Sequence, residues 1–255
     1  MSPRPYLLAE TNWQTVKDTD YQVAILPWGA TEAHNWHLPY ATDNLQVEHV
    51  MAEAGRLAWE DGAKVVVLPC VPFGVNTGQM DVKLCMNLNP STQLAILRDV
   101  VEVLAGHGIR KFVIANGHGG NHFKQMLREL SVEFPEVFSC ALNWFQAVNW
   151  DDYFDEPGDH AGEMETSAIL HIAPHLVLPK SEWGDGYARP WKVKALRDGW
   201  VSSQRQWTKV TADTGVGNPA KSSAEKGAAY LQACQESIAE FLIELAAVDV
   251  DELYE

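Results

Sequence analysis

Short apolar runs alternate with segments of helical spacing along this chain, and the alternation limits the fold more than any other feature. Strands are predicted at 21–26, 64–68, 111–115 and 137–142, with Pro27 and Pro69 ending the first two. Helices are predicted at 44–61, 91–107, 121–134, 163–171 and 223–247, the second capped by Ser91. This rhythm predicts an α/β fold, a three-layer α/β/α sandwich around a mainly parallel sheet.

Polar motifs follow each predicted strand. Stretches 28–39, 73–78 and 116–121 come after the first three strands, and Asn143 with the stretch 160–167 comes after the fourth. In an open parallel sheet, sites form outside the carboxyl ends of the strands. The residues rich in His, Glu and Asp are therefore expected to meet at one edge of the sheet.

The chain length and composition indicate one globular domain covering residues 1–255. The sequence has 255 residues, of which 46% are apolar, enough for a sizeable core. The segment from about 175 to 220 is richer in Trp, Gly and Pro, and is expected to be a loop-rich or small antiparallel excursion.

The net charge of −15 argues against nucleic acid or an anionic membrane as a partner. No apolar run approaches the ~20 residues needed to span a bilayer, and the N-terminus lacks a signal-peptide profile. The four cysteines form no close pair, which is typical of reduced thiols in a cytoplasmic protein. A cytoplasmic location is therefore expected.

Three residues after the first strand have side chains that bind metals. Glu32 and His34 are two apart, so an extended backbone would point both toward one cavity. Asp43 lies at the expected start of a helix, where it could act simply as an N-cap. Considered together with the other candidates, Asp43 is interpreted as a metal ligand able to bridge two ions.

His118 lies in the glycine-rich stretch Asn116-Gly-His-Gly-Gly-Asn. The glycines permit close approach of the backbone, so the stretch could also be a tight turn or an anion-binding helix N-terminus. Neither glycine-rich phosphate-binding spacing is present. A nucleotide-binding function is therefore the weakest hypothesis.

The stretch His160-Ala-Gly-Glu-Met-Glu-Thr-Ser offers a ligand, an acid and a base at a helix start. Glu163 could alternatively form part of a solvated acidic first turn. Mixed oxygen and nitrogen ligands favour Zn²⁺, Mn²⁺ or Fe²⁺. Ser-His-Asp or Cys-His catalysis lacks a recognisable nucleophile motif in this sequence.

In these motifs the sequence resembles the creatininase family of creatinine amidohydrolases. The matching pieces are Gly29-Ala-Thr-Glu-Ala-His-Asn-Trp-His-Leu-Pro with Thr42-Asp43, then the His118 stretch, then the His160 stretch, with a weaker match at 215–227. They occur in family order over roughly positions 22 to 230. Gly120 departs from the pattern, because creatininases proper carry a metal-binding glutamate there.

The resemblance implies a homo-oligomer, with a hexamer suspected, and one or two divalent ions per chain, with zinc favoured over manganese or iron. The residues that match family metal ligands are Glu32, His34, Asp43 and His118. Glu165 matches a family carboxylate at the site and is a further candidate ligand. His160 is similar to the histidine assigned to proton transfer, and Glu163 is a second catalytic candidate. The glycine at position 120 resembles other branches of the family, which include a formamide deformylase and a peptide-processing enzyme.

The expected function is hydrolysis of a small, possibly cyclic amide by attack of a metal-bound hydroxide on the carbonyl. Deformylation of a formamide and processing of a peptide are alternatives within the family. A non-catalytic metal-binding module is the alternative from another class of protein. Retention of both His160 and Glu163 beside the ligand set favours an enzyme.

Overall fold

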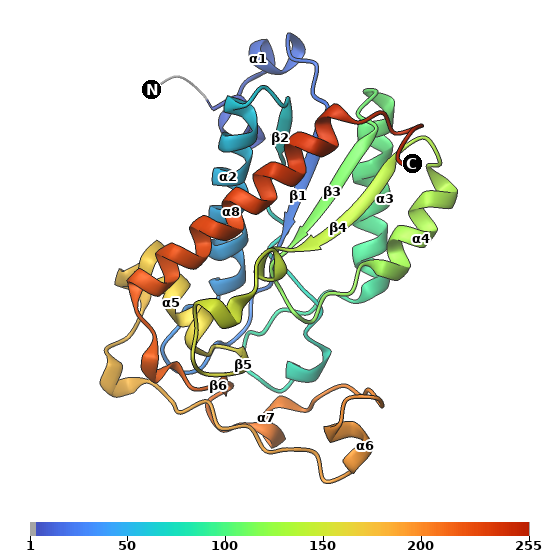
Figure 1. The fold of residues 1–255 in the computed structure, drawn as a ribbon. Helices are drawn as coiled ribbons and strands as arrows, with labels where there is room; N and C mark the ends of the chain where they lie inside the picture. Colours follow the sequence, from blue (N-terminus) through green and yellow to red (C-terminus); the bar gives the residue numbers. More distant parts are fainter. Residues whose placement is uncertain (1–3, 255) are drawn as a thin grey trace.

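The computed structural model describes residues 4–254 and has a four-stranded parallel sheet at its centre. The strands are β1 (Val23–Trp28), β2 (Val65–Val67), β3 (Lys111–Asn116) and β4 (Phe138–Asn143), in the order β2-β1-β3-β4. Helices cover both faces, which confirms the predicted three-layer α/β arrangement (Figure 1).

Each face of the sheet has its own apolar core because successive strand residues point to opposite faces. On one face Val113 packs with α2 (Thr42–Glu60) and α8 (Ala224–Ala247), beside which lies α5 (Glu163–Ile172). On the other face Phe112 packs with α3 (Pro90–Gly106) and α4 (Lys124–Glu133). The sheet is therefore buried on both sides, as its continuous apolar strands predict.

The remaining elements are short. They are α1 (Trp13–Lys17), α6 (Lys194–Arg197), α7 (Trp207–Val210) and an antiparallel pair formed by β5 (Gly158–His160) and β6 (Val216–Gly217). Figure 1 shows β5, β6, α6 and α7 beyond the carboxyl ends of the parallel strands. These segments therefore lie at the sheet edge where the sequence places its polar motifs. Within residues 4–254, no helix is long and apolar enough to cross a bilayer.

The strand order places a switch point between β1 and β3. The chain moves from β1 outward to β2, then crosses back to form β3 on the other side of β1. The loops that leave β1 and β3 therefore diverge and leave a crevice between them, the usual position of a site in such a sheet. Glu32 and His34 follow β1 and His118 follows β3, so the topology brings them together.

The prediction that Pro27 ends the first strand is wrong. Pro27 lies inside β1 and is paired in register with Ala115. Its carbonyl oxygen accepts from the Val71 amide, on the β2 side, beyond the end of β2 at Val67. Because the ladder with β2 has already ended there, the missing N–H of proline breaks no strand hydrogen bond.

Two predicted helix starts also differ from the structure. Helix α3 begins at Pro90, with Asn89 rather than Ser91 at the N-cap position, because proline suits the first helical turn. Helix α4 begins at Lys124 rather than at residue 121, and Asn121 lies in the turn before it, where its side chain bonds to Val75 N and Asn116 Oδ1.

Candidate metal centre

Six of the seven predicted site residues form one cluster. Within it, three groups of metal-binding atoms each lie within 4.8 Å of one another: Glu32 with Asp43 and His118, His34 with Asp43 and Glu165, and Glu32 with His34 and His160. These residues come from the loops after β1 and β3, the first turns of α2 and α5, and strand β5. The switch point of the sheet thus gathers residues up to 133 positions apart in sequence, from Glu32 to Glu165.

Asp43 lies at the centre of this cluster. Its Oδ1 atom is 3.1 Å from His34 Nε2 and its Oδ2 atom is 3.1 Å from His118 Nδ1. Ala41, not Asp43, is at the N-cap position of α2, so the alternative role of Asp43 as a simple cap is wrong. The two carboxylate oxygens of Asp43 face different histidines, the arrangement expected of a bridging group.

Backbone carbonyl groups fix the orientation of three histidines. His118 Nε2 lies 3.2 Å from Val75 O, His34 Nδ1 lies 3.2 Å from Glu32 O, and His160 Nε2 lies 2.8 Å from Ala33 O. Because a carbonyl oxygen can only accept, each of these nitrogens carries the hydrogen. When such a ring is neutral, its other nitrogen presents a lone pair toward the carboxylates, as metal-ligating histidines do.

Two buried carboxylate oxygens in the cluster have no hydrogen-bond partner of acceptable geometry among the described residues. They are Glu32 Oε1 and Asp43 Oδ2, which lie 2.9 Å and 3.1 Å from His118 Nδ1. Burying an unpaired carboxylate is costly unless a cation or donor compensates for it. The two oxygens thus converge on His118 Nδ1.

The buried carboxylates also perturb the histidines. Burial lowers the pKa of His34, but Asp43 and Glu165 raise that pKa well above its usual value. Burial likewise lowers the pKa of His118, and Glu32 and Asp43 reverse the effect, so its pKa too is raised. The carboxylates thus favour the protonated form of both rings when no metal is bound.

A strained turn presents Glu165 to the cluster. Ala161 has φ of 52°, in the left-handed region that residues with a Cβ rarely adopt, and its N–H donates to Glu165 Oε2. Glu165 Oε1 then lies 3.7 Å from His34 Nε2. The turn between His160 and α5 thus points both side chains toward the same cluster.

Glu163 is not part of the cluster. One of its carboxylate oxygens accepts from the backbone amides of Asp155 and Glu156 at 2.9 and 2.8 Å, and the other pairs with Lys226. Its carboxylate is therefore already engaged in holding the 155–156 turn and α8. These contacts favour a structural role for Glu163 over the predicted catalytic one.

Gly74 and Gly120 make room for His118. A Cβ at Gly74 would lie 2.6 Å from His118 Cδ2, and a Cβ at Gly120 would lie 2.5 Å from Val75 O and collide with His118 Nε2. A side chain at position 120 would therefore displace the hydrogen bond that orients His118. These contacts account for glycine at position 120 in this chain.

Gln79 contacts the cluster directly and is absent from the site residues predicted from the sequence. Gln79 is buried, lies in a 3₁₀ turn (Thr77–Gln79) after β2, and donates from Nε2 to Glu32 Oε2. Because a carboxylate can only accept, the Gln79 oxygen must face the other way, and it accepts from Cys85 Sγ at 3.1 Å. Gln79 thereby occupies one oxygen of Glu32 and leaves Oε1 facing His118.

A Gln79→Leu variant is expected to bind zinc about ten- to a hundredfold more weakly, the usual cost of losing a partner that orients a ligand. The measurement is a zinc dissociation constant obtained by competition with a chromophoric chelator. Gln204→Leu, in the wall of the same cavity, is the matched control and should bind as the wild type does. An unchanged dissociation constant for Gln79→Leu would show that Glu32 needs no such support.

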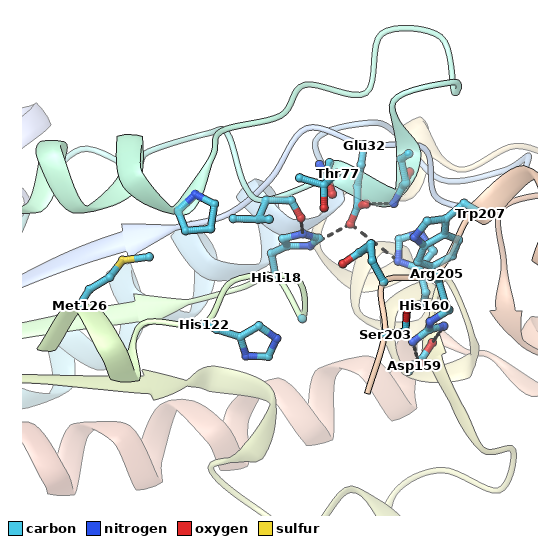
Figure 2. A pocket seen from close by; sticks show the side chains of 17 residues that line it. Glu32, Thr77, His118, His122, Met126, Asp159, His160, Ser203, Arg205 and Trp207 are labelled. Atoms are coloured by element: carbon cyan, nitrogen blue, oxygen red, sulfur yellow. Dashed lines mark hydrogen bonds and ion pairs between the residues drawn. The ribbon is translucent and has the colours of Figure 1, made fainter. Parts of the chain in front are cut away.

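A cavity of about 550 Å³ borders the cluster. In Figure 2, Glu32 and His118 border it, His160, Arg205 and Trp207 gather on one side, and His122 and Met126 lie on the other. The Trp207 ring lies 4.6 Å from that of His160, and Arg205 pairs with Asp159. A segment from the irregular 175–220 region thus forms one wall of the cavity.

The structure therefore defines a three-layer α/β protein with a buried carboxylate–histidine cluster at its switch point. The creatinine amidohydrolase family model matches residues 9–242, and the chain belongs to this creatininase family of amidohydrolases. A Bacteroides fragilis NCTC 9343 protein, provisionally described as a creatinine amidohydrolase, has a similar crystal structure. It is 43% identical, with a TM-score of 0.92, over 98% of this chain and 99% of that one.

Two curated relatives have different activities. Creatinine amidohydrolase of Pseudomonas putida is 26% identical over 61% of this chain and 66% of its own length. Mycofactocin precursor peptide peptidase of Mycobacterium tuberculosis H37Rv is 26% identical over 86% of this chain and 85% of its own length. Creatininase structures described as a Zn–Zn form and a Mn form share the fold, at 23% and 24% identity and TM-scores of 0.71 and 0.74. Both alignments cover 95% of this chain and 99% of the creatininase chain.

Proposed function

We propose that this protein is a metal-dependent amidohydrolase that cleaves the C–N bond of an amide at the Asp43 cluster. The observation that carries the proposal is the shared position of Asp43 in two groups of ligand atoms. Glu32, Asp43 and His118 would hold one divalent ion. His34, Asp43 and Glu165 would hold a second, so the chain has ligands for one or two ions.

The ligand set fits a transition metal. Buried carboxylate oxygens without partners, and imidazole lone pairs fixed by backbone carbonyls, are what Zn²⁺, Mn²⁺ or Fe²⁺ require. Zinc and manganese are supported by the forms in which the creatininase neighbours were solved. Such an ion, when bound, polarises a carbonyl group and lowers the pKa of water to ~7.

His160 is the residue proposed to move the proton to the departing nitrogen. Its Nε2–H is held by Ala33 O, so Nδ1 is free to accept and release a proton at the cluster, 3.8 Å from Glu32 Oε1. The Trp207 ring packs edge-on against the His160 ring. Glu32, held by Gln79, keeps its free oxygen in place beside both His118 and His160.

The proposed substrate is either a short peptide or another small amide, but not creatinine. Creatinine is disfavoured because Gly120 replaces a glutamate of creatininases proper. Peptide processing is favoured by the alignment with the mycofactocin peptidase, which spans more of the chain than the alignment with the Pseudomonas putida enzyme.

The test is hydrolysis of creatinine, formamides and short peptides by protein stripped with a chelator and then reloaded with zinc, manganese or iron. The proposal expects turnover of at least one amide class that disappears on stripping and returns on reloading. Turnover that survives stripping would contradict it. Metal binding without turnover of any amide would favour the non-catalytic module instead.

Metal binding is expected to release protons. Nearby carboxylates raise the pKa of His34 and His118 and so favour the protonated rings when no metal is bound, whereas a ring that ligates a metal must give up its second proton. Zinc binding should therefore release protons, and zinc affinity should rise with pH. Titration calorimetry at pH 7 in buffers of different ionisation enthalpy measures how many are released. A heat that does not depend on the buffer would contradict the account.

A further inference from the structure

A second cavity of about 240 Å³ approaches the same cluster from another side. Both cavities are lined by Gly119, Asp159 and His160, and the smaller one also reaches Glu165. Glu32 and His118 face the larger cavity. The cluster therefore has space on two sides, and His160 borders both.

The smaller cavity has an apolar wall formed by Phe145, Trp150, Met164 and Tyr230. The Tyr230 hydroxyl donates to Phe145 O at 2.6 Å, so it offers no free donor. Three acidic residues of the wall are also engaged: Glu163 pairs with Lys226, Glu156 lies 2.7 Å from Lys221, and Asp159 pairs with Arg205. The wall also includes Gln146, whose Oε1 accepts from Asn143. A neutral, apolar group is therefore the chemistry that suits this cavity.

The larger cavity is polar by comparison. Its lining includes the side chains of Asn76, Thr77, His122, Ser203 and Arg205. At the border between the cavities, a Cβ on Gly119 would meet nothing within 4 Å. The space beside Gly119 is therefore open, and no side chain packed there separates the two cavities.

We propose that the smaller cavity is a subsite for an apolar substituent of the amide, and that the substrate is a linear amide with a group in each cavity. This inference rests on the proposed function and narrows its substrate class. A linear, peptide-like amide has substituents on both sides of the scissile bond, whereas a small cyclic amide would occupy only one of the two spaces.

The test compares two metal-binding probes on the zinc-loaded protein, acetohydroxamate and 3-phenylpropanohydroxamate. Burial of the phenyl arm is expected to lower the dissociation constant about tenfold or more in the wild type. Trp150→Ala removes part of the smaller cavity's wall and should abolish most of this gain. Trp207→Ala makes the same change in the larger cavity and should keep it. Should Trp150→Ala not fold, Gly119→Leu tests the same point by filling the open border.

Each result has a distinct meaning. A phenyl gain lost in Trp150→Ala or Gly119→Leu, and kept in Trp207→Ala, supports the subsite. No phenyl gain in the wild type, or a gain lost only in Trp207→Ala, overturns it while leaving the proposed function intact. Failure of the zinc-treated protein to bind acetohydroxamate overturns the metal centre and the subsite together.

Discussion

An Asp43→Ala variant is expected to lose its transition metal and its hydrolytic activity while keeping its fold. Asp43 belongs to two of the three groups of ligand atoms, and each of its oxygens lies 3.1 Å from a different histidine. Loss of a residue that merely orients a ligand costs about ten- to a hundredfold in metal affinity or activity, so loss of a shared ligand should cost more. Metal analysis and turnover of the same preparation provide the measurement.

Asp61→Ala is the matched control for this experiment, because Asp61 is an exposed aspartate at the other end of the same helix, α2. The control should keep the metal content and turnover of the wild type. Circular dichroism of both variants separates loss of the fold from loss of the site. A folded Asp43→Ala protein with normal metal content would rule out the bridging role.

A His160→Ala variant is expected to bind metal normally and to turn over its amide substrate about 10²- to 10⁴-fold more slowly, the usual contribution of a positioned acid or base. The reason is that His160 borders both cavities and has one nitrogen free at the cluster. His122→Ala, which changes another histidine of the larger cavity, is the control and should have a much smaller effect.

The result for His160 also decides between two roles. Glu32, His34 and His160 form the third group of ligand atoms, so His160 has the geometry of a ligand as well as that of an acid. Loss of metal in His160→Ala would make it a ligand. Retention of metal with a fall in the turnover number would make it the proton carrier.

The part of the site that the sequence could predict lies in the motifs that follow the strands. Apolar runs followed by acidic and histidine motifs predicted one polar edge, and the order β2-β1-β3-β4 brings Glu32, Asp43 and His118 together there. The sequence could not separate Glu163 from Glu165 by proximity alone. On a helix, residues two apart do not share a face, and Glu163 binds Lys226 while Glu165 turns to His34.

Other features depend on tertiary contacts that leave no local signal. Gln79 follows the stretch 73–78, but an amide side chain carries no recognisable motif until Glu32 and Cys85 are seen on either side of it. A proline usually ends a strand. Pro27 can lie inside β1 because β2, the neighbouring strand, is short. Strand β5, which positions His160, has only three residues and was not predicted.

Anomalous diffraction at the zinc edge, from crystals grown with zinc, tests the central claim most directly. The account predicts a peak among Glu32, Asp43 and His118, or among His34, Asp43 and Glu165, or at both positions. Zinc peaks confined to other parts of the chain, or no peak in protein that is fully folded, would contradict a metal centre built on Asp43.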